Sequence, residues 1–158
     1  MTFLILKTIH IFSAFLLFGT GLGSAFYKFA ADRGGNIEHI ANTNKNVVLA
    51  DWLFTTPTVI IQPLTGILMA NMLNLPLSTP WIMISLILYA IAGACWLPVV
   101  ILQIRMREIS RRALRENTEL PEQYHRIARI WFWLGVPAFI AMSTVIILMV
   151  LKGLAIAF

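Results

Sequence analysis

The sequence contains few charged residues and a single cysteine, and each shortage excludes a class of structure. Charged residues make up 12% of the 158 positions, whereas 59% are hydrophobic and the mean hydropathy is +0.81. A soluble globular domain is typically about 25% charged, so this composition predicts an integral membrane protein. The single cysteine, Cys95, excludes an intramolecular disulfide and is expected to fill a packing position within a hydrophobic stretch.

Motifs typical of several common activities are absent as well. The sequence has no internal repeat, glycine-rich phosphate loop, paired metal-ligand motif or hydrolase nucleophile motif. Its basic residues are not interleaved with aromatic residues as in a nucleic-acid-binding module, so no nucleic-acid partner is expected. The net charge of +5 instead predicts a basic rim that contacts anionic membrane lipid.

Four long hydrophobic stretches are present, at about 3–29, 48–73, 81–104 and 130–156. A hydrocarbon core of about 30 Å takes about 20 apolar residues per helix, and each stretch is long enough to cross it. Tryptophans, which favour the membrane interface, lie at or near the start of three stretches. They are Trp52, Trp81, Trp131 and Trp133. The sequence therefore predicts an all-α, four-helix transmembrane bundle, with residues 1–158 forming a single integral membrane domain.

The first and third connections between these stretches differ. Residues 30–47 contain Gly-Gly and several asparagines and are predicted to form a loop with at most one helical turn. In the third connection, Glu108 precedes Arg111 and Arg112 by a spacing that stabilises helices. The third helix is therefore predicted to extend into the cytoplasm, and Pro121 to lie in the first turn of the helix that follows.

The distribution of basic residues predicts an orientation. All lysines and arginines except Lys7 and Lys152 belong to the first and third connections. Because lysine and arginine are retained on the cytoplasmic side, we predict that both termini face the periplasm or exterior.

Polar side chains recur on one face of three predicted helices, at the spacing of an α-helix. The first helix carries His10, Ser13, Thr20, Gly21 and Ser24; the second carries Asp51, Thr55, Thr58, Gln62, Thr65 and Met69; the third carries Ser85, Tyr89 and Gln103. Polar groups facing lipid would be left unsatisfied, so these stripes predict a shared interior that holds a ligand. The alternative is that they only join helices by hydrogen bonds. Carbonyls freed by Pro57 and Pro63 are expected to bond with threonine or water.

His10 is the ionisable group that most suggests a cofactor. An imidazole within a span, with Lys7 and Lys152 at similar depth, resembles a haem pocket: His10 would bind the iron and the lysines the propionates. Gly21 would let the macrocycle approach, and Met69 is the candidate second ligand unless the iron is five-coordinate. Alternatively, the lysines extend to water and His10 donates a hydrogen bond to Thr65 or Ser13.

For each of the other ionisable groups two roles are possible. Asp51 either forms an ion pair with Lys45, Lys28 or an arginine of the third connection, or begins a proton relay through Thr55, Thr58 and Gln62. His39 and His125 lie on the cytoplasmic side. They are either solvated or bind a metal with nearby carboxylates.

Several segments resemble a known family. The stretches "LKTIHIFSAFLLFGTG", "PTVIIQPLTGILM", "PWIMISLILYA" and "GVPAFIAMSTVIILMVLK" are similar to the helices of HemJ-type protoporphyrinogen oxidases, four-helix inner-membrane proteins that bind haem b. The segments "LLFGTGLGSAFYK" and "YHRIARIWFWLGVPAF" resemble more closely an uncharacterised family of bacterial predicted integral membrane proteins. The chain is therefore identified as a member of that family, distantly similar to the oxidases.

These observations lead to three expectations of function. The first is a redox protein that binds haem b and acts on a porphyrin or quinone-like substrate. The second is a small transporter or channel-like protein whose stripes line a path. The third is a structural or assembly subunit, in which Gly19 and Gly23 form a small-residue face for a partner helix or a second copy.

Overall fold

The computed structural model describes the backbone of residues 1–155 and the side chains of residues 1–151. Its elements are α1 (Thr2–Gly34), α2 (Ile37–Ala50), the π-helical turn η1 (Asp51–Thr55), α3 (Thr56–Met72), α4 (Pro80–Glu116) and α5 (Glu122–Ala155). No strand occurs in the described residues. Four helical segments are long and apolar enough to cross a membrane: Thr2–Gly34, Ile37–Met72, Pro80–Glu116 and Glu122–Leu151. The predicted all-α fold class with four spans is thereby confirmed.

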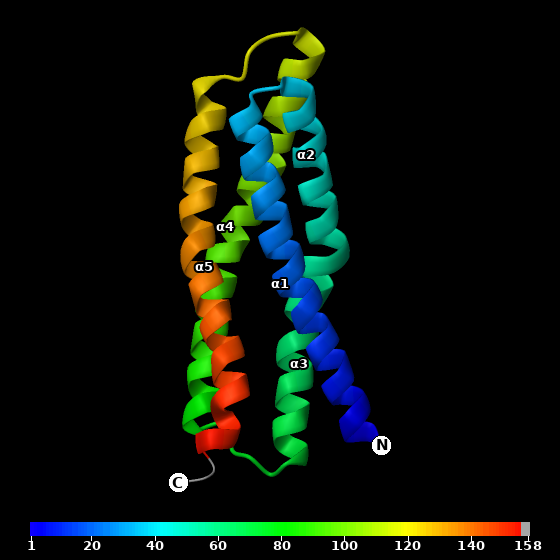
Figure 1. Cartoon of the computed structure of the whole chain (residues 1–158), viewed down its shortest axis with the longest axis vertical. Coiled ribbons are helices and arrows are strands. Elements are labelled where there is room, and N and C mark those ends of the chain that lie inside the picture. Colours follow the sequence, from blue (N-terminus) through cyan, green and yellow to red (C-terminus); the bar gives the residue numbers. More distant parts are fainter. Residues whose placement is uncertain (156–158) are drawn as a thin grey trace.

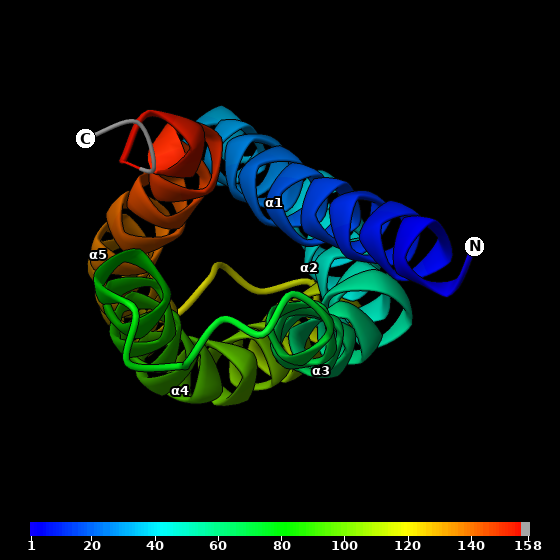
Figure 2. The same ribbon diagram turned by 90° about the horizontal axis from the view of Figure 1, so that it is seen from below.

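The segments form an elongated bundle with both termini at one end and the α4–α5 connection at the other (Figure 1). Helix α1 packs against α2 and α3, while α4 packs along α5 and against α2. Helices α1 and α5 make few contacts with each other. Viewed along the bundle, the helices are arranged in a ring (Figure 2).

The loop predicted for residues 30–47 is wrong, because most of this segment is helical. Helix α1 continues to Gly34 and α2 begins at Ile37. Gly35 ends α1 in the left-handed conformation (φ 69°), and the Asn36 side chain accepts a hydrogen bond from the His39 backbone N–H at 2.9 Å. Glycine and asparagine thus serve here as helix caps between two closely spaced helices rather than as loop residues.

The prolines of the second span determine its local geometry. Pro57 follows the π-helical turn η1, where the Thr56 hydroxyl donates to the Asp51 carbonyl at 2.9 Å. Pro63 has no N–H, so the Val59 carbonyl lacks its helical donor. The Tyr89 hydroxyl supplies one from α4 at 2.7 Å. The freed carbonyl therefore bonds with tyrosine, not with the expected threonine or water, and this bond joins α3 to α4.

Buried apolar side chains concentrate toward the end of the bundle that holds the α4–α5 connection. The core there includes Ile40, Met106, Tyr124, Ile127 and Trp131. Along the rest of the helices many large apolar side chains face outward, for example Phe15 and Ile60, which are 72% and 58% exposed. Such surfaces suit a hydrocarbon environment, whereas soluble monomers rarely expose large apolar patches.

Candidate functional site

A cavity of about 340 Å³ lies within the bundle. Its walls are mainly aliphatic and aromatic side chains from α1, α4 and α5, with η1 and α3 closing one side. Among the lining residues are Leu17, Phe18, Gly21, Asp51, Thr55, Tyr89, Trp96, Gln103, Trp131, Gly135, Phe139 and Met142. The interior is therefore largely apolar, with a few polar side chains among its lining residues.

Three polar side chains that line the cavity are almost fully buried. We call the end of the bundle that holds the α4–α5 connection its basic end. Asp51 and Gln103 are each 5% exposed, and Thr55 is 4% exposed. The Thr55 hydroxyl donates to Asp51 Oδ1 at 2.8 Å. Both residues belong to the π-helical turn, a feature frequently found at functional sites. Leu17, Phe18 and Met142, which also line the cavity, are apolar, so the cavity is amphipathic.

Four buried side-chain atoms lack a hydrogen-bond partner among the described residues: Asp51 Oδ2, Trp96 Nε1, Gln103 Oε1 and Trp131 Nε1. All four belong to residues that line the cavity. Asp51 Oδ2 and Gln103 Oε1 are acceptors, whereas the two indole N–H groups are donors. Because buried polar groups nearly always have a partner, the four groups make this cavity the candidate binding site.

The cavity borders the seam between α1 and α5. Two ring contacts cross this seam, between Phe18 and Phe139 (centroids 5.1 Å apart) and between Phe29 and Phe132 (6.2 Å). Gly21 also lines the cavity along α1, and a methyl group added to it would meet no heavy atom within 4 Å. The glycine thus leaves space beside the seam, and its predicted contact with a haem macrocycle stays a prediction.

His10 does not line the cavity; it lies at the contact between α1 and α3. Its Nδ1 is 2.8 Å from Thr65 Oγ1, and Gln62 Nε2 donates to the His10 carbonyl at 3.1 Å. Thr65 gives its single hydroxyl hydrogen to the Ile61 carbonyl at 2.7 Å, so the imidazole N–H is the donor in the contact with Thr65. Of the alternatives considered for His10, the structure shows the hydrogen bond with Thr65.

The remaining predicted site residues are dispersed. The hydroxyls of Thr58, Ser85 and Ser13 donate to carbonyls of their own helices, which explains their burial without a ligand. Met69 is half-buried and Lys7 is exposed; neither lines the cavity. The side chain of Lys152 lies outside the described residues.

The described lining of the cavity does not fit a haem. No histidine lines it, and its one charged side chain, Asp51, is acidic and would repel propionates. No cluster of three or more metal-binding side chains occurs in the part of the chain that the structure describes. His39 and His125 are exposed. Haem b at His10 stays a prediction.

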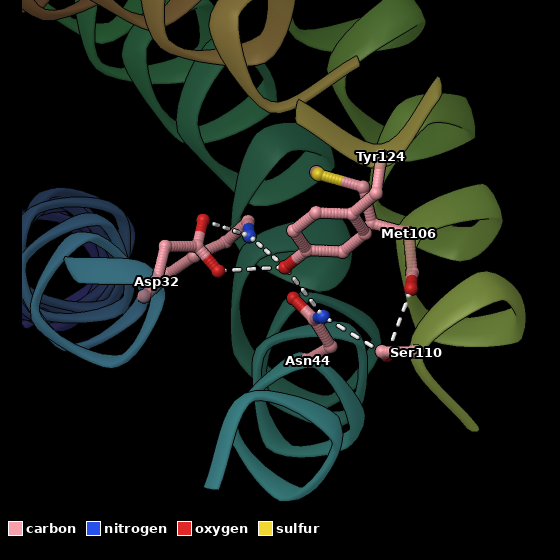
Figure 3. Close-up of polar contacts among 6 residues, drawn as sticks. Asp32, Asn44, Met106, Ser110 and Tyr124 are labelled. Carbon is pink, nitrogen blue, oxygen red and sulfur yellow. Dashed lines mark hydrogen bonds and ion pairs between the residues drawn. The ribbon is translucent and has the colours of Figure 1, made fainter. Parts of the chain in front are cut away.

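A second buried polar cluster lies at the basic end, outside the cavity (Figure 3). Lys28, 1% exposed, donates to Asp32 Oδ2 at 2.8 Å and to the Tyr124 hydroxyl at 3.0 Å. Tyr124 donates to Asp32 Oδ1 at 2.6 Å and accepts from Asn44 at 2.9 Å. Asn44 also donates to Ser110 at 3.1 Å. We call these five residues the basic-end network. The network joins α1, α2, α4 and α5. Within it Lys28 pairs with Asp32, and not with Asp51.

Sequence reasoning missed Asp32, Asn44, Ser110 and Tyr124 as a cluster. The four-residue spacing of Lys28 and Asp32 on one helix does indicate that these two side chains can pair. No local pattern connects Tyr124 with Asp32, because these residues are 92 positions apart. Trp96 lies seven residues from both Tyr89 and Gln103, so helical spacing already places it on the polar face of the third predicted helix. That its indole N–H and that of Trp131 lack a partner leaves no mark in the sequence.

The small-residue face predicted at Gly19 and Gly23 is not covered within the described chain. A methyl group added to either glycine would meet no heavy atom within 4 Å. A partner at this face, including a second copy, stays a prediction. Cys95 is half-buried and unpaired, as expected.

Comparison with known proteins gives one family. Residues 4–153 match the family described as "Predicted integral membrane protein (DUF2269)". No curated protein and no solved structure matches the chain.

Proposed function

The chain belongs to the DUF2269 family of predicted integral membrane proteins, and we propose that it binds an amphipathic small molecule in the cavity between its helices. The observation that carries this proposal is that four unpartnered polar atoms belong to residues that line one largely apolar space. A polar group buried without a partner is costly, by about 1–3 kcal/mol in protein data. Four such groups around one space are best explained by a ligand that bonds with them.

The size and polarity of the cavity suit such a molecule. Its volume of about 340 Å³ lies at the small end of the range typical of ligand pockets, roughly 300–1,000 Å³. A ligand would place its polar head near Asp51 and Gln103 and its apolar body near Phe18 and Met142. This orientation follows the amphipathic character of the cavity itself, and a bilayer would supply such a molecule through the seam between α1 and α5.

The head group must both donate and accept hydrogen bonds. Asp51 Oδ2 and Gln103 Oε1 require donors, while the indole N–H groups of Trp96 and Trp131 require acceptors. A quinone-like molecule in its reduced form and an amphiphile with an amine and a neighbouring oxygen both meet these requirements.

Identification of the bound molecule tests this function. Wild-type protein, purified in mild detergent and extracted with organic solvent, should release an amphipathic small molecule detectable by mass spectrometry. Gln103→Leu, which removes one acceptor, should release several-fold less, whereas Gln123→Leu on the exposed start of α5 should release the wild-type amount. Recovery of bulk phospholipid alone, equal in all three proteins, would contradict the proposal.

Haem b at His10 is a second candidate, favoured by the hydrogen bond at His10 Nδ1. A metal-ligating histidine usually donates its other ring N–H to a fixed acceptor, as His10 does to Thr65. An absorption spectrum of the purified protein should then show a Soret band that His10→Ala removes. Protein with no such band, and none after haem is added, would eliminate this candidate.

The placement of basic residues supports an orientation in the bacterial inner membrane with both termini periplasmic. The α4–α5 connection, flanked by arginines, lies at the opposite end from the termini (Figure 1). In a Cys95→Ala background, Thr2→Cys should react with a membrane-impermeant thiol reagent added outside the inner membrane, and Thr118→Cys should not. The reverse pattern of labelling would refute this orientation.

A further inference from the structure

We infer, resting on the proposed function of the cavity, that the ligand carries a positively charged amine or amidine on its head group and that Asp51 binds it. The inference depends on three features of the cavity: a buried carboxylate that lacks a counter-charge, aromatic walls, and the absence of a lining cation among the described residues.

The first feature is the state of the Asp51 carboxylate. It is 5% exposed, accepts a hydrogen bond from Thr55 at Oδ1 and also interacts with the Gln103 side chain, while Oδ2 has no partner among the described residues. Ion pairs among residues 1–151 involve Asp32, Glu108 and Glu116, and none involves Asp51. A buried carboxyl group that stays ionised requires a counter-charge or further hydrogen bonds. A cationic N–H group placed at Oδ2 supplies both.

The second feature is the aromatic lining. Tyr89, Trp96 and Trp131 line the cavity together with Asp51, and Phe18, Phe132 and Phe139 line it from α1 and α5. Aromatic faces attract cations, tryptophan most strongly, and carboxylate-plus-aromatic sites recognise ammonium groups. Lys28 already lies 5.5 Å from the centre of the Trp131 ring, so Trp96 is the indole more available to a ligand cation.

The third feature concerns competing charges. Lys28, which lies near the Trp131 ring, forms an ion pair with Asp32 at 2.8 Å. Its positive charge is therefore compensated by Asp32. An anionic head would face an uncompensated carboxylate, and a neutral head would leave the carboxylate without a counter-charge. The cationic head is therefore favoured, with Gln103 Oε1 as the second acceptor for its N–H groups.

Three probes that share a phenyl ring and a four-carbon chain separate the charge classes. They are 4-phenylbutylamine, 4-phenylbutanol and 4-phenylbutanoate. The full chain is reconstituted in lipid nanodiscs, and binding is followed by the change in intrinsic fluorescence of Trp96 and Trp131, with Trp96→Phe identifying the signal from the cavity. We expect the amine to bind about tenfold more tightly than the alcohol, the size expected for a charged hydrogen bond, and the carboxylate to bind most weakly.

Variants of Asp51 assign the preference to this residue. Asp51→Asn keeps the shape but removes the charge, and should weaken amine binding about tenfold while changing alcohol binding less than about twofold. Asp51→Glu retains the charge and should keep the preference for the amine. Glu38→Gln, which changes an exposed carboxylate at the start of α2, is the matched control and should bind all three probes as the wild type does.

The outcomes separate the inference from the proposed function. If the alcohol binds as tightly as the amine, or if Asp51→Asn weakens both equally, the cationic head group is refuted while the cavity remains a binding site. If none of the probes changes the Trp96-dependent signal, and the purified protein also releases no small molecule, the proposed function fails and the inference with it.

Discussion

Two buried polar clusters in the described part of the chain each contain an aspartate but differ in how fully their groups are paired. In the basic-end network, Lys28, Asp32 and Tyr124 bond with one another, and Asn44 and Ser110 extend the chain of bonds. In the cavity, Asp51 and Gln103 each leave a buried oxygen without a partner. A network whose groups all have partners fixes helices relative to one another, whereas buried groups without partners can still bond with a ligand.

The two clusters are adjacent, and Trp131 lies between them. The Lys28 ammonium is 5.5 Å from the centre of the Trp131 ring, while the indole N–H is among the unpartnered atoms of the cavity. The basic-end network therefore also holds one wall of the cavity in place. Substitutions in the two clusters should accordingly affect different properties, stability in one and ligand binding in the other.

Replacing each of the two aspartates by asparagine should give the largest difference in stability between the two clusters. Asp32→Asn removes the counter-charge of the buried Lys28 and should lower the free energy of unfolding by about 3 kcal/mol or more. Asp51→Asn removes no ion pair and should change it by less than about 1 kcal/mol. Unfolding by SDS in mixed micelles, followed by circular dichroism, measures both.

A double variant provides the control for this pair. Lys28→Met combined with Asp32→Asn removes both charges, so it should be less destabilising than Asp32→Asn alone. Equal losses for Asp32→Asn and Asp51→Asn would show that the two clusters do not differ as described.

Tyr124→Phe should have the next largest effect. The hydroxyl makes three hydrogen bonds, to Asp32, Lys28 and Asn44, so its removal should cost about 1–3 kcal/mol of stability. Tyr27→Phe, at a position 67% exposed, is the matched control and should be nearly neutral. The same unfolding measurement applies, and a neutral Tyr124→Phe would mean that the network contributes little.

Tyr89→Phe tests the contribution of a hydrogen bond made by a residue that lines the cavity. It removes the donor to the Val59 carbonyl, which Pro63 deprives of a helical partner, and should cost about 1 kcal/mol. In a Pro63→Ala background the helix regains that donor, so Tyr89→Phe should cost less. A double-mutant cycle measures the difference, and additive effects would argue against this role of the tyrosine.

Gly135→Ala should have the smallest effect, and in the opposite direction. A methyl group there would meet no heavy atom within 4 Å, so the variant should gain about 0.5–1 kcal/mol from reduced backbone freedom. Because Gly135 lines the cavity, the variant should also bind 4-phenylbutylamine less tightly. Gly66→Ala is the comparison, since its methyl group would lie 3.4 Å from His10 Cε1 and should gain less. A loss of stability at Gly135 would show that the helices pack there.

The spans and the burial of the polar stripes could be predicted from the sequence, because both depend on local properties. Hydrophobic length defines a membrane helix, and helical spacing places Asp51, Thr55 and Gln103 on the inner face. The function of the hydroxyls could not be predicted in the same way. Thr58 and Ser85 bond with carbonyls of the preceding turn, so a buried hydroxyl at helical spacing does not by itself indicate a lumen.

The sequence by itself determined that this chain crosses a membrane with four helices and which faces of those helices turn inward, since each follows from the composition and period of a single segment. Only the tertiary structure decided which inward-facing groups meet. His10 bonds with Thr65, 55 positions away, and Tyr124 with Asp32, 92 positions away, while Asp51 is left beside open space. The physical reason is that such partnerships depend on how whole helices cross, and the separation of α1 from α5 that creates the cavity is not encoded in any one segment.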